Sequence, residues 1–205
     1  MTQKICVVTG ATDGIGKRTA EILAGQGFIL GLVGRNLKKG KKVVQELSIQ
    51  SENDNIHYFN GDLSLMSEVK KVAGAIQNKF HVIDVLINNV GAAFFKKTFT
   101  SEGFESTFAL NHLSYFLLTK LLLGKLNQQG ARIVNVASDA HIGAGLDFND
   151  LQGVNPYGGY PNYQRSKLMN ILFSYELAHR LKDRPITVNC LHPGFVASKF
   201  GHNNS

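Results

Sequence analysis

Short apolar segments alternate with longer segments of helical periodicity along the whole 205-residue sequence. Because the apolar segments are brief and continuous, they are typical of strands that helices cover on both faces. Alternation of this kind requires crossover connections, so it predicts one α/β domain over residues 1–205 with an open, doubly wound parallel sheet. The expected strands are 4–9, 28–34, 55–60, 82–88, 132–137 and 187–192, and the expected helices are 15–26, 37–50, 65–80, 101–126 and 160–181.

The composition excludes several classes of protein. Hydrophobic residues make up 43% of the chain and charged residues 18%, which is typical of a globular domain. No apolar stretch approaches the ~20 residues that cross a bilayer and no signal peptide precedes the first strand, so we expect no transmembrane segment. The two cysteines, Cys6 and Cys190, lie in apolar runs. They predict buried thiols, no metal site and a reducing, cytoplasmic location.

The formal net charge of +7 raises the question of an anionic partner. Its densest cluster is a run of four lysines just after a predicted strand, for which a solvated helix face is the simplest interpretation. The run lacks interleaved aromatic residues, and the chain lacks zinc or helix-turn-helix spacing, so we expect no nucleic-acid partner. The four lysines are Lys38, Lys39, Lys41 and Lys42.

A glycine-rich turn follows the first predicted strand and opens the first predicted helix. Glycines in this context permit a tight turn and close approach of the backbone to a pyrophosphate, and the helix N-terminus favours the anion. An ordinary glycine turn is the alternative. The context favours a dinucleotide site of the Rossmann fold, with cofactor contacts expected from Gly10, Thr12, Asp13, Gly14, Ile15 and Gly16.

Arg35 indicates which dinucleotide is bound. An NAD site places an acidic residue at the end of the second strand, whereas this chain has Gly34-Arg35-Asn36 there. A guanidinium grips a 2′-phosphate with two hydrogen bonds, so Arg35 favours NADP(H). A surface arginine at the start of a helix is the alternative interpretation. Asp13 argues in the other direction, because a basic residue in the glycine turn suits NADP(H) better.

Tyr163 and Lys167 stand four residues apart on a predicted helix and therefore share one face. A tyrosine hydroxyl has a pKa of about 10, and a neighbouring ammonium lowers it. Lowering that pKa to about 7 requires about 4 kcal/mol, more than a solvated ion pair supplies. The pattern Tyr-x-x-x-Lys also occurs by chance, so its interpretation depends on the residues around it.

Ser138 and Asn111 are the other polar candidates. Ser138 follows the fifth predicted strand, where its hydroxyl is placed to hold a substrate oxygen; a helix cap or a loop serine is the alternative. Asn111 interrupts an apolar helix and needs hydrogen-bond partners if it is buried. A structural hydrogen bond and a place in a proton relay are both open for Asn111.

Taken together, the motifs resemble the short-chain dehydrogenases/reductases, and the resemblance covers essentially the whole chain. The segments around Asn111 and Lys167 are similar to the retinol-dehydrogenase-like branch, as is Ser138-Asp139-Ala140-His141. The matching motifs are Thr9–Gly16, Asp62-Leu63, Asn88-Asn89-Val90-Gly91, Asn111, Ser138, Tyr163 with Lys167, and His192-Pro193-Gly194.

The resemblance implies a catalytic role for four residues. Tyr163 is expected as the general acid/base, and Lys167 as the residue that holds the nicotinamide ribose and lowers the tyrosine pKa. Ser138 is expected to orient the substrate oxygen, and Asn111 to anchor a water that connects Lys167 to solvent. The implied cofactor contacts are Asp62 and Leu63 at the adenine, Asn89 at the adenosine-side ribose, Gly91 in the same motif, and Pro193 with Gly194 at the nicotinamide.

The chain departs from the family pattern at three places. Val90 replaces the usual alanine, and Ser198 stands where threonine is usual. The third departure is the ending at Ser205, where family members continue into substrate-covering helices and a seventh strand. We therefore expect a fragment, a splice form or a truncated product with six strands, in which 187–192 becomes an exposed apolar edge.

The resemblance implies hydride transfer between NADP(H) and a carbonyl or alcohol substrate, with a lipophilic, retinoid- or steroid-like molecule favoured. Aromatic residues in the strand-end loops either line such a pocket or close the core beneath the loops. A catalytically weak NADP(H)-binding regulatory protein or a truncated isoform is the alternative. The family commonly forms dimers or tetramers, so a homodimer is one expectation. The aromatic residues are Phe94, Phe95, Phe99, Tyr157 and Tyr160.

Overall fold

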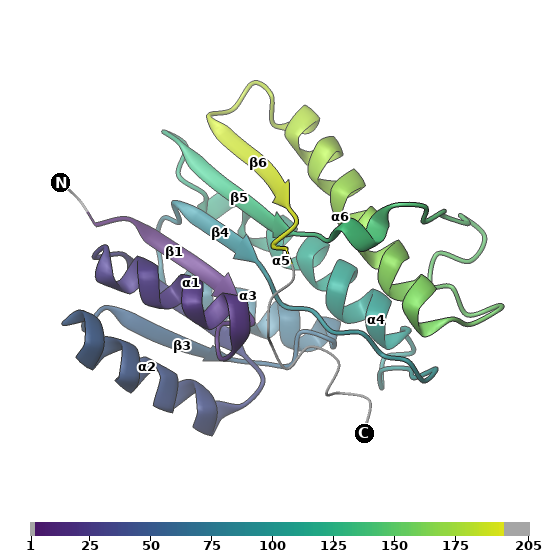
Figure 1. The fold of residues 1–205 in the computed structure, drawn as a ribbon. Coiled ribbons are helices and arrows are strands. Elements are labelled where there is room, and N and C mark those ends of the chain that lie inside the picture. The colour runs from purple at the N-terminus through teal and green to yellow at the C-terminus, as the bar shows by residue number, and fades with distance from the viewer. Residues whose placement is uncertain (1–2, 195–205) are drawn as a thin grey trace.

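The computed structural model describes residues 3–194. Six parallel strands form one sheet in the order β3-β2-β1-β4-β5-β6, with helices on both faces (Figure 1). The predicted α/β fold with a doubly wound parallel sheet is confirmed. Ser198 and the final residues, for which the sequence also carried expectations, lie outside the described range. The strands are β1 Ile5–Thr9, β2 Ile29–Gly34, β3 Ile56–Asn60, β4 Val85–Asn88, β5 Ala131–Val136 and β6 Ile186–Leu191.

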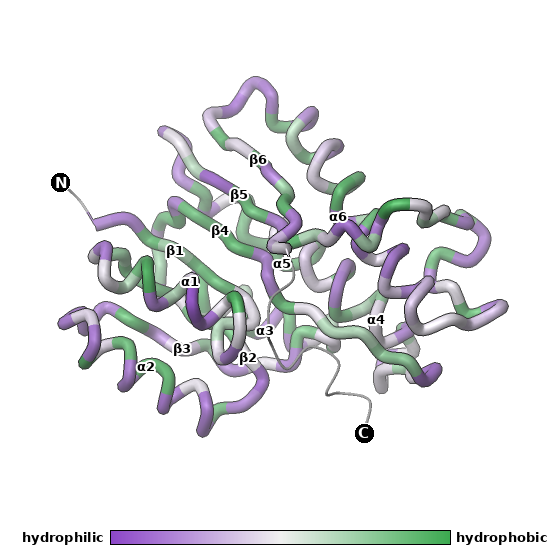
Figure 2. The backbone as a smooth tube through the Cα atoms, viewed as in Figure 1, coloured by the Kyte–Doolittle hydropathy of each residue, from purple (hydrophilic) through white to green (hydrophobic). Residues whose placement is uncertain are grey.

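The helices divide the core into two apolar clusters. α1 (Gly14–Gly25) and α2 (Leu37–Ser51) pack on one face of β1–β3, and α3 (Met66–Lys79), α5 (Ser114–Leu122) and α6 (Gly159–Arg180) pack on the other face. Figure 2 shows the apolar residues concentrated on the central strands β1 and β4. Burial of these apolar side chains is the main favourable contribution to folding. No helix within residues 3–194 is long and apolar enough to cross a membrane.

The strand order reverses between β1 and β4. In open α/β sheets, ligands bind outside the carboxyl ends of the strands at such a switch point. The glycine turn lies there because Ala11 N donates to Val33 O at 3.2 Å, which ties the turn to the end of β2. The fold therefore places the predicted dinucleotide site at the crevice between the two halves of the sheet.

The predicted single helix over 101–126 is wrong at its N-terminal end. Phe99 and Glu105 instead form an antiparallel bridge around Gly103, whose φ of +82° favours glycine. Helix α4 (Ser106–Phe108) begins after this bridge because a Glu105 carboxylate oxygen accepts a hydrogen bond from Phe108 N at 2.8 Å. The π-helical segment Ala109–Leu113 then leads into α5, followed by a short 3₁₀ turn over Leu123–Lys125.

Strand β6 forms one edge of the described sheet, and it differs from the prediction of a strand covered on both faces. Thr187, Asn189 and Leu191 are exposed, so the outward row is mostly polar rather than apolar. Cys190 on this strand is half-buried, whereas the predicted burial of Cys6 is confirmed. An apolar sequence run therefore did not reveal that β6 has only one covered face.

Candidate active site

Helix α6 places Tyr163 and Lys167 one turn apart beside the end of β5. Lys167 is only 3% exposed, and its Nζ donates to Val136 O at 3.0 Å. The same Nζ lies 5.6 Å from the centroid of the Tyr163 ring. Ser138 follows β5, and its side chain lies close enough to that of Tyr163 to lower the tyrosine pKa. The structure thus brings together three of the four residues that the sequence singled out for catalysis.

Burial controls the protonation of this cluster. Burial raises the pKa of Tyr163, the neighbouring Ser138 side chain acts in the opposite direction, and the nearby Tyr160 raises the pKa further. Burial therefore sets the direction of the shift in this arrangement, and the expectation that Lys167 lowers the tyrosine pKa stays a prediction. Burial also lowers the pKa of Lys167 from 10.5 to about 8. At neutral pH the cluster consists of a neutral phenol and a positively charged amine.

Asn111 lies in the π-helical segment, and its hydrogen bonds connect the loop after β4 to α6. Its Nδ2 donates to Ala92 O at 2.9 Å and to Ser166 Oγ at 3.0 Å, while its Oδ1 accepts from Ala92 N at 2.9 Å. The main-chain oxygen of Asn111 accepts a hydrogen bond from Asn170 Nδ2 at 2.9 Å. These contacts match the structural alternative for Asn111, and the water-mediated relay stays a prediction.

Gly91 lies between Asn111 and Lys167. A Cβ on Gly91 would lie 3.3 Å from Asn111 Oδ1 and 3.5 Å from Lys167 Nζ, so the glycine keeps space beside both groups. Asn170, which sequence reasoning missed, is a second buried amide on an apolar helix face, the same signal that singled out Asn111.

The glycine turn has the shape that a pyrophosphate cradle requires. Gly10 and Gly14 have φ values of +66° and +49°, which favour glycine. A Cβ on Gly16 would overlap Gly10 O and lie 2.5 Å from Asn89 Nδ2. Asn89 Nδ2 in turn donates to Thr9 O at 2.9 Å. The residues present therefore fit a dinucleotide, and Asn89 also fixes the turn itself.

We expect Gly16→Ala to weaken binding of a nicotinamide dinucleotide and to destabilise the fold by about 1–3 kcal/mol, the usual effect of overpacking. The added methyl group has to displace the backbone at Gly10 or the side chain of Asn89. Urea unfolding and a cofactor titration measure the two effects. Gly25→Ala is a matched control, because a Cβ there meets no atom within 4 Å. Equal behaviour of the two variants would contradict the close packing.

The other predicted cofactor residues follow the same edge of the sheet. Thr12 and Ile15 are half-buried in the glycine turn, and Arg35 is exposed between β2 and α2. Asp62 follows β3, where its Oδ1 accepts from Ser64 N at 3.0 Å and shapes a turn. Leu63 is 3% exposed and belongs to the apolar core, so its adenine contact stays a prediction and would have to come from its backbone.

Pro193 and Gly194 follow β6, and a pair of side chains connects this turn to the segment that carries Ser138. His192 Nε2 lies 3.2 Å from an Asp139 carboxylate oxygen, and Asp139 N donates to His192 Nδ1 at 3.2 Å. Asp139 is the residue after Ser138. Sequence reasoning missed this pairing, because 53 positions separate the two partners.

The predicted aromatic residues fall into two groups. Phe94 packs against the core, and Tyr157 ties two loops together through hydrogen bonds from its hydroxyl to Phe94 O at 2.7 Å and Lys96 O at 3.0 Å. Phe95, Phe99 and Tyr160 are about half exposed. The interpretation as core-closing side chains therefore holds for Phe94, and a substrate pocket lined by the exposed residues stays a prediction.

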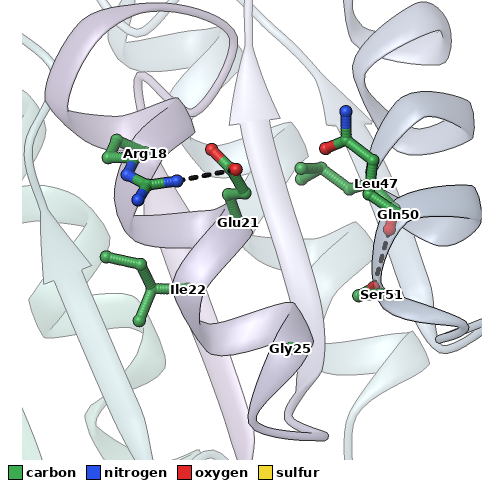
Figure 3. Close-up of a pocket in the computed structure, with 7 residues that line it drawn as sticks. All are labelled: Arg18, Glu21, Ile22, Gly25, Leu47, Gln50 and Ser51. Carbon is green, nitrogen blue, oxygen red and sulfur yellow. Dashed lines mark hydrogen bonds and ion pairs between the residues drawn. The ribbon is translucent and has the colours of Figure 1, made fainter.

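A separate hollow lies between α1 and α2, as Figure 3 shows. Arg18 and Glu21 form an ion pair at 2.6 Å on its wall, and Ile22 and Leu47 supply apolar surface. None of the predicted site residues lines this hollow. It lies on the helical layer rather than at the strand ends, so it is not part of the candidate active site.

Comparison with known proteins agrees with this geometry. Residues 4–205 match the family described as short chain dehydrogenase. The chain is 40% identical over 197 residues to retinol dehydrogenase 12 of Bos taurus, covering 96% of this chain and 62% of that protein. An uncharacterised Mycobacterium paratuberculosis protein of known structure is similar with a TM-score of 0.84 and 34% identity, covering 95% of this chain and 69% of the other.

A third relative was crystallised with a dinucleotide. The Pseudomonas aeruginosa RhlG/NADP active-site complex is similar with a TM-score of 0.79 and 26% identity, covering 97% of this chain and 75% of the other. The chain thus spans less than two thirds of the bovine retinol dehydrogenase and about three quarters of RhlG. Because the family match covers nearly all of the sequence, the chain belongs to the short-chain dehydrogenases/reductases, in their retinol-dehydrogenase-like branch.

Proposed function

We propose that this chain is an oxidoreductase that transfers a hydride between NADP(H) and a carbonyl or alcohol substrate. The observation that carries the proposal is the cluster at the strand ends, where the Ser138 side chain lies near Tyr163 and Lys167 lies over the tyrosine ring. The glycine turn opens on the same edge of the sheet. A phenol, a hydroxyl and an ammonium beside a dinucleotide cradle suit proton transfer to or from a substrate oxygen.

The chemistry is divided between the cofactor and the chain. When bound, NADP(H) supplies or accepts the hydride. In the reduction direction, the Tyr163 hydroxyl donates a proton to the substrate oxygen, and the raised pKa of Tyr163 keeps that proton in place at neutral pH. Ser138 donates a hydrogen bond that orients the same oxygen. The Lys167 ammonium would hold the nicotinamide-side ribose, and its positive charge favours the tyrosinate left after transfer.

A lipophilic substrate of retinoid or steroid type is the substrate class that we propose. Phe95 and Phe99 in the loop after β4 and Tyr160 in the first turn of α6 are about half exposed, and the ring of Tyr160 lies 6.4 Å from that of Tyr163. Apolar side chains of this kind favour an apolar substrate next to the proton donor. The retinol dehydrogenases among the relatives support this choice.

The preference for NADP(H) rests on Arg35, and we expect Arg35→Ser to weaken NADPH binding by about 10-fold or more, as loss of a charge-assisted hydrogen bond does. NADH, which lacks the 2′-phosphate, is expected to bind with nearly unchanged affinity. Fluorescence titration with both nucleotides measures this. Arg18→Ser is the matched control, because Arg18 pairs with Glu21 on the helical layer. Equal losses for NADPH and NADH would contradict the assignment.

Turnover with NADPH and a panel of aliphatic, retinoid and steroid carbonyl compounds tests the activity. Cofactor oxidation that depends on the carbonyl compound supports the enzyme. Tight NADPH binding without turnover on any compound would instead favour a cofactor-binding regulatory protein. Failure to bind either nucleotide would exclude both functions.

A further inference from the structure

Asp13 places a carboxylate inside the glycine turn, an unfavourable position for a protein that binds two phosphates and a 2′-phosphate nearby. Its Oδ1 accepts from Gly14 N at 2.9 Å and caps α1. Its Oδ2 lies 2.6 Å from Lys39 Nζ in an ion pair. Lys39 belongs to the lysine run that the sequence assigned to a solvated helix face. Lys38, Lys41 and Lys42 are exposed as predicted, but Lys39 points toward the glycine turn.

The start of α2 is fixed, and this fixes where Lys39 lies. Asn36 Oδ1 accepts from Lys39 N at 2.9 Å and caps the helix. Asn36 O accepts from Tyr58 Oη at 3.0 Å. The Tyr58 ring packs on Gly40, where a Cβ would overlap the ring. Because Tyr58 is on β3, the backbone that carries Lys39 is held by both the helix cap and the neighbouring strand.

The charges of Asp13 and Lys39, where the glycine turn meets the start of α2, affect how well a 2′-phosphate binds. The phosphate is close to a dianion, and the Asp13 carboxylate repels it. Lys39 cancels that charge, so Arg35 is left to attract the phosphate. An ammonium has three donors, which allows it to contact Asp13 and a phosphate oxygen together.

We propose that Lys39 is a second cofactor-specificity residue, which neutralises Asp13 and contacts the 2′-phosphate so that an acidic glycine turn accepts NADP(H). This inference rests on the proposed preference for NADP(H). The competing role for Lys39 is purely structural: its ion pair with Asp13 would connect α1 to α2, as the ion pair of Lys17 with Glu46 does at 2.7 Å. A structural tie would affect NADPH and NADH alike, whereas a specificity residue discriminates between them.

The test compares dissociation constants for NADPH and NADH in wild type, Lys39→Gln, Asp13→Asn and the double variant. We expect Lys39→Gln to weaken NADPH binding by about 10- to 100-fold, as expected for a lost charge-assisted hydrogen bond plus an uncompensated acid. We expect a change of less than about 3-fold for NADH, since its nearest phosphates are held by the glycine turn. The double variant is expected to recover part of the NADPH loss, because it removes the repelling carboxylate as well.

Lys42→Gln is the matched control, because it removes the same charge from the same helix at an exposed position beside Glu46. Thermal unfolding of each variant verifies that the fold is retained, and Lys39→Arg is expected to keep the NADPH preference. An unchanged NADPH-to-NADH ratio in Lys39→Gln, or no recovery in the double variant, would overturn the inference while leaving a wild-type preference for NADPH intact. A wild type that binds NADH as tightly as NADPH would overturn the proposed cofactor and this inference together.

Discussion

Tyr163→Phe is expected to reduce turnover by a factor of about 10²–10⁴, the usual contribution of a positioned proton donor. The substitution removes only the phenolic oxygen, so the aromatic ring keeps its place over Lys167 and beside Tyr160. Without that oxygen, no group on α6 at this position can give a proton to the substrate oxygen. Steady-state kinetics with NADPH and a carbonyl substrate measure the loss as a fall in kcat/KM.

Cofactor binding separates loss of chemistry from loss of the site. NADPH affinity of Tyr163→Phe is expected to stay within about 3-fold of wild type, since a single neutral hydroxyl contributes little to binding. Tyr175→Phe is the matched control, because Tyr175 lies on the same helix and is 71% exposed. Turnover of Tyr163→Phe close to that of Tyr175→Phe would remove the tyrosine from the mechanism.

The sequence predicted most of the sheet, including the edge position of β6, but not which faces of β6 are covered. All six strands and the helices α1, α2, α3 and α6 were predictable, because a strand covered on both faces reads as a short apolar run. The exposed face of β6 was not predictable, since Val188 and Cys190 resemble any buried pair. The bridge between Phe99 and Glu105 was also missed, because only the φ of Gly103 marks where the chain turns before α4.

The sequence predicted which residues belong to the candidate site, but not the contacts that these residues make. Local spacing on α6 was enough to pair Tyr163 with Lys167, and strand ends located Ser138. Contacts between distant segments depend on how elements pack, so the ion pair of Asp13 with Lys39 had no signal in the sequence. The direction of the Tyr163 pKa shift had none either, because burial depends on neighbours that the sequence does not place.

Lys167→Met is expected to abolish turnover and, unusually for a change in an active site, to raise the free energy of unfolding by about 3 kcal/mol at pH 7. Burial lowers the pKa of Lys167 from 10.5 to about 8. A pKa shift of one unit corresponds to about 1.4 kcal/mol, so keeping Lys167 charged in the folded protein costs about 3 kcal/mol. Methionine fills a similar volume without a charge, although Val136 O loses its hydrogen bond with Nζ.

The pH dependence gives the sign of the effect. Below pH 8 the lysine is protonated in both the folded and the unfolded protein, so the destabilisation is fully present. Between pH 8 and pH 10.5 the folded protein releases the proton first, so wild type gains stability relative to Lys167→Met until the charge contribution disappears. Urea unfolding at pH 7 and pH 10.5 measures this convergence. Lys42→Met, at a side chain 76% exposed, is expected to show no such dependence. A Lys167→Met protein less stable than wild type at pH 7 would contradict the prediction. It would show that the ammonium stabilises the fold, and that keeping Lys167 charged does not cost the protein stability.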